Sequence, residues 1–433
     1  MLGKFNNKNY LCTKPSIYSM DSQLNVNVQS EIGELEAVII HKPGPEVERM
    51  TPSNAHLALY SDILSQQVAQ AEHDQLSGAL NKVCRTYEVA DLLKATLERN
   101  QVKKTLVQKI CQHEGLSHLT DHLLSLDSSA LSNALIEGLP LEASPIMDNL
   151  SQERFALKPL YNLYFTRDAS MTIGGRVLIG KMANAVRDRE SLIMETIFTE
   201  QFGVATVNPM NSNAFGSATI EGGDVLVVRD DVLLIGNGCR TNAMGIDFIA
   251  NHFVQGPGLQ HIIVQELPHH PESFIHLDMV FTLLDVDKCM VYAPVIFSNY
   301  RTTHFTLEGG KVVKVSTEDN IPKALSKLGI NLKPILCGGT DSWMQEREQW
   351  HSGANFVCVG PGKLIGYARN QHTIEQLNQN GFDVVRANDL IGGKDSIDGR
   401  KSYVITIDGS ELSRGGGGAR CMTMPVKRKL VSW

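Results

Sequence analysis

Two patterns of apolar and polar positions alternate along the chain. Between about residues 52 and 140, apolar residues recur three and four positions apart and glycines are few, as in AHLALYSDILSQQVAQAEHDQLSGAL and YEVADLLKATLERNQVKKTLVQKI. This spacing places apolar side chains on one face of a helix. Gly138 and Pro140 end the pattern, since neither residue favours continuation of a helix. The segment therefore predicts a helical subdomain.

Most of the remaining chain repeats a strand–turn–strand pattern. Apolar, β-rich runs flank Gly-Gly, Asp-Asp, Asp-Lys or Pro-Gly-Lys, which are signals of a hairpin. Helical patterns at 189–202, 243–253 and 320–329 separate these repeats. The four repeats are MTIGGRVLIG (171–180), VLVVRDDVLLIG (225–236), VFTLLDVDKCMVYAP (280–294) and NFVCVGPGKLIGYARN (355–370).

A fifth repeat is predicted to be split between the two ends of the chain. It would join ELEAVIIHKPG near the start to SYVITIDGSEL near the end. Recurrence at similar intervals indicates one α/β unit repeated around a centre. An ordinary mixed α/β sheet is the competing interpretation, and the pattern alone does not decide between them.

Composition narrows the class of protein. With 433 residues and 42% hydrophobic content, the chain can bury a large core and form two or three domains. No apolar run reaches the length of a membrane span. The first twenty residues carry scattered polar groups without the apolar centre of a signal peptide, and we expect ordered sequence to begin near Met20.

The net charge and the spacing of the cysteines argue against a nucleic-acid-binding protein and against a zinc site. A net charge of −7, with both signs mixed along the chain, argues against a nucleic-acid partner, which favours a basic face. The eight cysteines form no CxxC pair and no compact His/Cys cluster, so we expect no zinc. Scattered cysteines without a secretion signal indicate mostly buried thiols in a reducing compartment, the cytoplasm.

The segment SRGGGGARCMTMP at 413–425 carries the first candidate for chemistry. Four consecutive glycines favour neither a helix nor a strand, but they let backbone approach a ligand closely. Cys421 follows them, and the neighbouring Arg420 would favour the nucleophilic thiolate. A flexible loop with an incidental thiol would have the same pattern.

FIHLDMVF at 274–281 supplies an imidazole and a carboxylate. His276 and Asp278 are two positions apart, so on a strand they would point the same way. One could act as an acid–base and the other as a charge anchor. A histidine is often structural, but a carboxylate in an apolar run needs a partner when it is buried.

Two further segments add carboxylates. In IEGGDVLVV at 220–228, Glu221 precedes two glycines and a strand, as a residue at the mouth of a strand would. In NLYFTRDAS at 162–170, Asp168 stands near Asn162 and Arg167. A surface turn and a surface Arg–Asp pair are the alternatives for these two segments.

One thiol, one imidazole and three carboxylates fit a cationic substrate. A Cys–His pair with a carboxylate that orients the histidine is a general nucleophilic scheme. Additional carboxylates do not suit a neutral peptide amide. They suit a guanidinium group, whose pKa exceeds about 12 and whose N–H fork matches paired carboxylates.

FTRD, EGGD, HLDMVF and GGGARCMTMP, in this order and spacing, resemble the signature of arginine deiminases, within the guanidino-group-modifying superfamily. The opening GELEAVIIHKPGPEVERMTP and the helical insertion after it are also similar to this family rather than to its shorter relatives. The resemblance covers roughly residues 25–433. Each motif is weak alone, whereas four in order are specific.

The resemblance implies a fold and a division into domains. The fold is a five-bladed α/β propeller, called the pentein fold, with an inserted α-helical domain. The division is an N-terminal extension at 1–24, the start of the catalytic propeller at 25–80, the inserted domain at 81–157, and the remainder of the propeller at 158–433.

The resemblance also assigns the catalytic roles. It places the nucleophile at Cys421, the acid–base at His276 and the carboxylate beside that histidine at Glu221. The two guanidinium-binding carboxylates fall on Asp168 and Asp278. The implied activity is hydrolysis of L-arginine to L-citrulline and ammonia, in arginine catabolism, through a covalent thiouronium intermediate on the cysteine. It needs water and neither a metal nor a cofactor.

Recognition of the substrate carboxylate rests on the resemblance almost alone. It would fall to Arg187 in NAVRDRES and Arg240 in GNGCRTN, with help from Asn162. The chain departs from many relatives here. Cys239 stands where they have an acidic residue, and Gly416 stands where some carry an arginine.

Related activities stay open at this point. They are those of an amidinotransferase, a dimethylarginine hydrolase and an agmatine deiminase, and a non-catalytic arginine-binding protein is a further alternative. We expect a cytoplasmic protein without nucleic-acid or membrane partners. A homo-oligomer is allowed, and the sequence does not determine the oligomeric state.

Overall fold

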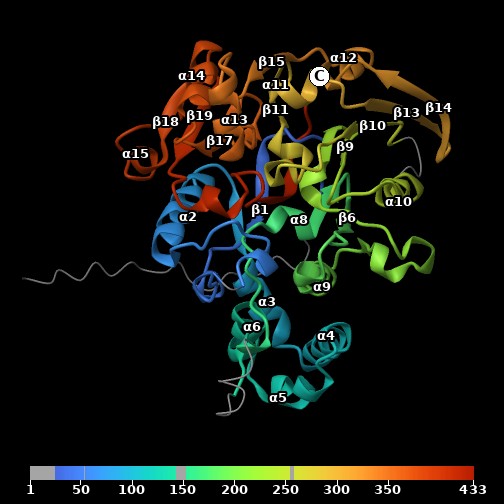
Figure 1. Cartoon of the computed structure of the whole chain (residues 1–433), viewed down its shortest axis with the longest axis vertical. Helices are drawn as coiled ribbons and strands as arrows, with labels where there is room; N and C mark the ends of the chain where they lie inside the picture. The colour runs from blue at the N-terminus through green and yellow to red at the C-terminus, as the bar shows by residue number, and fades with distance from the viewer. Residues whose placement is uncertain (1–24, 53, 143–152, 254–257) are drawn as a thin grey trace, which may run out of the picture.

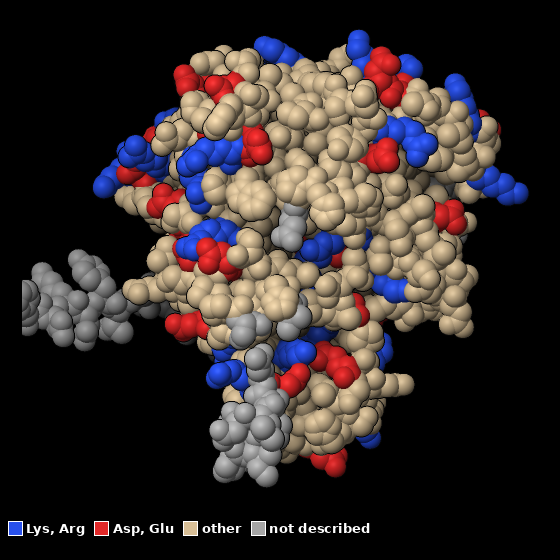
Figure 2. Space-filling model, in the orientation of Figure 1, with Lys and Arg blue, Asp and Glu red and all other residues tan. Residues whose placement is uncertain are grey.

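The computed structural model describes residues 25–433 except 53, 143–152 and 254–257. Sheets with helices between them form the larger part of the molecule, and helices α3 to α6 form a lobe below it in Figure 1. The predicted extension at 1–24 lies outside the described residues. On the face seen in Figure 2, basic and acidic side chains are interspersed.

Within the described residues, five groups of strands share one topology, an antiparallel pair followed by a third strand parallel to the inner one. The groups are β5 (Ser170–Ile173), β6 (Arg176–Ile179) and β7 (Thr206–Val207); β8 (Val225–Arg229), β9 (Val232–Asn237) and β10 (His261–Glu266); β11 (Phe281–Asp285), β12 (Lys288–Val291) and β15 (Lys333–Leu336); β16 (Val357–Gly360), β17 (Lys363–Tyr367) and β19 (Tyr403–Ile407); and β20 (Met424–Arg428), β1 (Leu35–Ile40) and β2 (Arg85–Glu88). The four predicted hairpins are thus confirmed.

The fifth predicted pair is wrong in one strand. β1 pairs with β20, whereas SYVITIDGSEL supplies β19, which lies between β17 and β18 (Asp383–Arg386). The continuous apolar run YVITI, buried throughout, suits a central strand with parallel neighbours. The sequence of β20, MPVKR, contains Pro425, which an edge strand tolerates.

Additional strands extend or adjoin these groups. The hairpin of β13 (Thr302–Glu308) and β14 (Lys311–Glu318) adds to the second group beyond β10, in the order β14-β13-β10-β9-β8. β3 (Leu139–Pro140) pairs with β4 (Phe155–Leu157) where the lower lobe returns to the sheets.

The helices of the lower lobe follow the predicted helical pattern. Asp127 caps the last of them by accepting hydrogen bonds from the backbone N–H groups of Ser129 and Ala130. β2, which the predicted boundary at 81 would assign to the insertion, pairs with β1 of the fifth strand group. The helices of this region are α2 (Gln66–Leu80), α3 (Val89–Leu97), α4 (Asn100–His113), α5 (Thr120–Ser125) and α6 (Ser128–Glu137).

The other helices connect the strands. Those predicted at 189–202, 243–253 and 320–329 are present as α9, α10 and α12. None of the helices in the described part of the chain combines the length and apolar character needed to cross a lipid bilayer. The connecting helices are α1 (Pro45–Glu48), α8 (Thr166–Ala169), α9 (Asp188–Thr196), α10 (Ala243–Phe253), α11 (Ala293–Ile296), α12 (Ile321–Ser326), α13 (Ser342–Trp350), α14 (Gln371–Gln379) and α15 (Ala387–Ile391).

Apolar side chains of consecutive strand groups share their cores. Leu178 and Val225 join the first group to the second, and a larger cluster joins the second, third and fourth groups. Ile365 and Val38 belong to one cluster that joins the fourth group to the fifth. Met424 packs in the same cluster as the first group. Each fully buried side chain of this kind stabilises the fold by about 1.5–3 kcal/mol, so the groups depend on one another.

A buried carboxylate on α2 holds the segment before the glycine run. Glu72, 3% exposed, accepts hydrogen bonds from the backbone N–H groups of Ser410 at 2.8 Å, Glu411 at 3.1 Å and Leu412 at 2.9 Å. A carboxylate is a strong acceptor for such groups. The position of the segment that leads to Cys421 therefore depends on this helix.

Replacing Glu72 by alanine removes the acceptor for three backbone N–H groups, of which those of Glu411 and Leu412 are buried. We expect the free energy of unfolding to fall by about 2–4 kcal/mol, measured by urea denaturation. Asp74→Ala on the same helix is the matched control, because Asp74 forms an exposed ion pair with Lys42 and such pairs contribute about 0–1 kcal/mol. Equal destabilisation by the two variants would contradict the anchoring role of Glu72.

Candidate functional site

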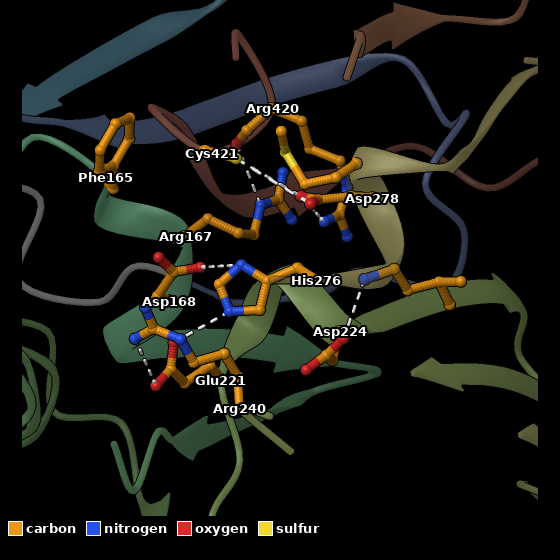
Figure 3. Close-up of polar contacts among 12 residues, drawn as sticks. Phe165, Arg167, Asp168, Glu221, Asp224, Arg240, His276, Asp278, Arg420 and Cys421 are labelled. Carbon is orange, nitrogen blue, oxygen red and sulfur yellow. Dashed lines mark hydrogen bonds and ion pairs between the residues drawn. The ribbon is translucent and has the colours of Figure 1, made fainter. Parts of the chain in front are cut away.

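The five predicted catalytic residues converge in one buried cluster (Figure 3). Their exposed fractions are 3% for Asp168, 0% for Glu221, 1% for His276, 0% for Asp278 and 2% for Cys421. Burial of three carboxylates and an imidazole is costly unless they pair with one another or with cations. Burying this cluster therefore costs the folded state free energy.

The strand topology explains this convergence. Each of these segments lies just before the outer antiparallel strand of one strand group. Asp168 precedes β5, Glu221 precedes β8, Asp278 precedes β11 and Cys421 precedes β20. Asn355, which the sequence analysis did not single out, precedes β16 in the same way. One position of the repeated unit therefore supplies every one of these side chains.

The predicted strand around His276 and Asp278 is wrong. The two residues lie at a single 3-10 turn, Leu277–Met279, and the strand begins only at Phe281. Asp224 holds this turn by accepting a hydrogen bond from the backbone N–H of Leu277 at 2.9 Å. Both side chains reach the site because of the turn, rather than because of the alternation of a strand.

Glycine is required beside the histidine. A Cβ atom on Gly223 would lie 2.5 Å from Cγ and Nδ1 of His276. No side chain fits at that distance, so the second glycine of EGGD lets the imidazole lie flat against the backbone. This contact gives a physical reason for the motif, which the sequence showed only as a turn.

His276 and Glu221 form the acid–base pair of the site. His276 Nε2 lies 2.9 Å from Glu221 Oε2, and Nδ1 lies 3.8 Å from Asp168 Oδ1. Burial alone would lower the pKa of His276, but Asp168, the hydrogen bond to Glu221 and Asp224 raise it to about 9. Burial opposes ionisation of Glu221, yet the bond to His276 and the charge of Arg240 hold its pKa at about 2. The pair is therefore imidazolium and carboxylate at neutral pH.

Each remaining aspartate is held by a buried arginine through one oxygen. Arg187 Nη1 donates to Asp168 Oδ2 at 2.8 Å, and Arg420 Nη1 donates to Asp278 Oδ2 at 2.7 Å. The second oxygen of Asp168 accepts no hydrogen bond from the described residues. Oδ1 of Asp278 lies 4.0 Å from the sulfur of Cys421. Oδ1 of each aspartate thus accepts no N–H hydrogen bond from the described residues, and that of Asp278 is in long contact with the thiol.

A glutamate stands behind each of these arginines. Glu190 accepts from Nη2 of Arg187 at 2.8 Å and from its Nε at 3.1 Å. Glu31 accepts from Nη2 and Nε of Arg420, both at 3.1 Å. The Glu–Arg–Asp chains fix the two aspartates from outside the cluster, and their charges partly compensate one another.

Cys421 is a buried thiol in this arrangement. Its sulfur lies 3.8 Å from Asp278 Oδ2 and accepts a hydrogen bond from Nδ2 of Asn355 at 3.2 Å. Burial, then the charges of Asp278 and Asp168, raise the pKa of Cys421 well above its ordinary value. Arg420 lowers the pKa of Cys421 as expected, but burial and the two aspartates outweigh this effect. A cation between the two aspartates would offset this unfavourable charge.

The three residues predicted to bind a substrate carboxylate differ in their burial and in whether their N–H donors are already bonded. Arg187 is 4% exposed and its donors are directed to Asp168 and Glu190. Arg240 is less buried, and its Nη1 lies 3.6 Å from Glu221 Oε1 and forms no hydrogen bond with the described residues. Nδ2 of Asn162 donates to a backbone carbonyl at 2.8 Å. Among these three, Arg240 alone retains a free donor next to the cluster.

The sequence analysis missed several residues of the site. Glu31 carried one signal, a carboxylate in the segment that leads into the apolar strand LEAVII. Asn355 carried none, since an asparagine at a turn before a strand is common. Glu190 looked like part of a charged helical turn. Their roles follow only from contacts across the fold.

Three residues of the cluster have side chains of the kinds that bind metal ions. Asp168, Glu221 and His276 each offer one ligand atom, and these atoms lie within 4.8 Å of one another. Arg187 and Arg240, 3.9 and 3.6 Å from Glu221, oppose a further cation at this position by charge repulsion. The absence of a metal from the reaction stays a prediction. All seven described cysteines are free thiols.

Comparisons with known proteins agree with this geometry. The family model of arginine deiminase matches residues 57–428. The N-terminal domain of ArgZ, solved with a covalently bound reaction intermediate, is 14% identical with a TM-score of 0.52, and the match covers 92% of this chain and 99% of that one. The fold is thus a mixed α/β fold like that of pentein structures.

Two other solved structures have the same fold. The amidinotransferase SxtG from Microseira wollei is 14% identical, with a TM-score of 0.54 and coverage of 94% of this chain and 99% of that one. A dimethylarginine dimethylaminohydrolase, solved as an adduct with S-methyl-L-thiocitrulline, is 15% identical, with a TM-score of 0.50 and coverage of 90% and 99%. At these identities the likeness concerns the fold alone.

The charge state of the histidine gives a direct test. His276 should titrate near pH 9 in an NMR pH series of the imidazole resonances, and Glu221→Gln should lower its pKa because the acceptor charge is lost. A raised pKa in the folded state favours folding below the unfolded value of about 6.5, and this contribution is lost as the pH rises through 9. A pKa near 6.5 in both proteins would contradict the arrangement.

Proposed function

Because the chain belongs to the arginine deiminase family, we propose that it hydrolyses L-arginine to L-citrulline and ammonia. The observation that carries the proposal is the pair of open aspartate oxygens beside the thiol. Each of Asp168 and Asp278 has one oxygen bound to an arginine of the protein and one directed to the cluster. A planar cation with N–H groups on two sides matches these acceptors.

The first half of the proposed reaction forms a bond from sulfur to carbon. Burial raises the pKa of Cys421 most, and the charges of Asp278 and Asp168 raise it further. A guanidinium between the two aspartates offsets their charges and adds a positive charge beside the sulfur, which lowers that pKa and lets the thiol lose its proton to solvent. The thiolate attacks the central guanidinium carbon. His276 donates a proton to the departing nitrogen, and ammonia leaves a cationic thiouronium adduct on Cys421.

The second half returns the enzyme to its starting state. His276, neutral after its proton transfer, accepts a proton from a water molecule that attacks the same carbon. The carbon–sulfur bond breaks as the hydroxyl of the adduct becomes the carbonyl of L-citrulline. The proton that this hydroxyl loses returns to sulfur through solvent, so the Cys421 thiol and the His276 imidazolium are restored. Glu221, ionised with a pKa of about 2, stabilises the imidazolium in the first half. One histidine thus serves as acid and then as base.

The five strand groups support the proposed five-bladed α/β propeller. Consecutive groups share apolar clusters, and the fifth group shares one with the first. A ring of blades accounts for that closed series of contacts. The division into a propeller at 25–80 and 158–433 and an inserted domain at 81–157 stays a prediction, and the pairing of β2 with β1 favours an insertion that begins after Glu88. A cytoplasmic location stays a prediction from the sequence.

Other chemistry on the same adduct is the main alternative. An amidinotransferase, a dimethylarginine hydrolase and an agmatine deiminase would use the same nucleophile with another acceptor or substrate, and solved structures of two of these classes share the fold. A non-catalytic arginine-binding protein would bind without releasing ammonia. The intact set of thiol, imidazole and carboxylates favours turnover.

Replacing Cys421 by serine tests the covalent scheme. Ammonia release from arginine should fall at least about 1,000-fold, because an alcohol cannot supply the thiolate. Arginine should still bind in calorimetry, since Asp168 and Asp278 are unchanged. The native protein, quenched in acid during turnover, should carry an adduct with the mass of arginine less ammonia. A serine variant that keeps a substantial rate would disprove the scheme.

Replacing Arg240 by alanine tests the choice of substrate. If Arg240 holds the substrate carboxylate, kcat/KM for arginine should fall about 10- to 100-fold through KM. The smaller rate with agmatine, which lacks that carboxylate, should change little. Parallel assays with arginine, agmatine and methylated arginine, with and without glycine as an amine acceptor, separate the related activities. Equal losses for arginine and agmatine would remove Arg240 from carboxylate recognition.

A further inference from the structure

A second site lies outside the buried cluster, in a cavity of about 310 Å³ between α13 and the start of α14. These helices are at the upper left of Figure 1. The side chains that line it and matter for the argument are Arg347, Glu348, His351, Arg369 and His372. Two arginines and two histidines thus surround one acid.

The single acid of this lining is held by hydrogen bonds from the start of α14. Glu348, 5% exposed, accepts hydrogen bonds from the backbone N–H groups of His372 and Thr373, both at 2.8 Å, and from the Thr373 hydroxyl at 2.6 Å. Its charge therefore compensates the first turn of α14. The charge of Glu348 therefore offsets little of the positive charge of the two arginines.

The cationic groups of the cavity retain free donors. Arg347 is exposed and forms no ion pair or hydrogen bond with the described residues. Arg369 uses Nη1 for the carbonyls of Gly409 and Ser410, and its Nη2 lies 3.2 Å from Nε2 of His351. Its Nε and one hydrogen of Nη2 stay free.

His351 lines the cavity as a ring whose Nδ1 has almost no accessible surface. Burial and the charges of Arg369 and Arg347 lower the pKa of His351 to about 4, so the ring is neutral near pH 7. Since Nε2 accepts from Arg369, Nδ1 carries the hydrogen, and this buried atom forms no hydrogen bond with the described residues. The cavity therefore combines unpaired positive charge with unused N–H donors.

We propose that this cavity binds an oxyanion of the phosphate class, either free phosphate or the phosphoryl group of a small molecule. Phosphate oxygens match the planar donors of two guanidinium groups, and the volume leaves room for a small substituent. A guanidinium substrate would be repelled here, so the site is separate from the cluster at Cys421.

The cavity also adjoins the segment before the glycine run. Arg369 donates to Gly409, Ser410 and the hydroxyl of Ser413, on the opposite side from the contacts of Glu72. On α13, Gln349 donates to the carbonyls of Ser273 and Met279, which flank His276. An anion bound between Arg347 and Arg369 would connect helix α13 to the segment before the glycine run, and both contact residues near the cluster.

Calorimetry with inorganic phosphate on the full-length protein, in a low-salt buffer near pH 7, tests the proposal. One saturable site is expected, and Arg347→Gln should weaken it at least about tenfold, since one of two guanidinium partners is lost. Arg386→Gln, at another exposed arginine whose side chain forms no ion pair or hydrogen bond with the described residues, is the matched control and should bind as the native protein does. A parallel titration with glycerol phosphate shows whether a phosphoryl group binds more tightly than free phosphate.

An NMR titration of His351 ties the binding to this cavity. Phosphate should shift the imidazole resonances of His351 and raise its pKa from about 4, because an anion stabilises the imidazolium. The shift should be absent in Arg347→Gln. No saturable binding of either compound, or binding that Arg347→Gln leaves unchanged, would overturn the proposal.

Discussion

The buried pairing of Asp168 and of Asp278 with an arginine of the protein is the constraint on which the rest of the site depends. Asp168 and Asp278 would repel each other and the thiolate if both were ionised without partners. Arg187 and Arg420 bind one oxygen of each and leave the other open. The two arginines thus supply most of the positive charge that offsets the aspartates, and a bound cation would need to supply only the rest.

This balance requires parts of the chain that are far apart in sequence to meet. The repeated strand unit achieves this, because the same position of each unit, just before its outer strand, lies at the cluster. Shared apolar cores keep the units in register. The glutamates Glu190 and Glu31 then orient the arginines from outside. Packing, rather than any single ion pair, fixes where the charges lie.

Local patterns allowed the helical lobe and four hairpins to be predicted, and the four motifs pointed to the five residues that converge in the cluster. These features depend on periodicity, turn residues and motif order. The partner of β1 could not be predicted, since strand pairing depends on packing over the whole chain. The turn at Leu277–Met279 was taken for a strand because its apolar residues run directly into β11. The hydrogen bond from Arg187 to Asp168 has no local signal in the sequence, whereas Arg187 and Glu190 are only three positions apart.

The anchoring of Arg420 and Cys421 by one side chain has a mechanical consequence. Oδ1 of Asn355 accepts the backbone N–H of Arg420 at 2.9 Å and that of Cys421 at 3.3 Å. One peptide unit therefore sets both the place of the sulfur and the reach of the guanidinium that restrains Asp278. A displacement of this unit would move attacking atom and counter-ion together. Their mutual alignment is thus preserved by covalent geometry, and it survives small movements of the loop around them.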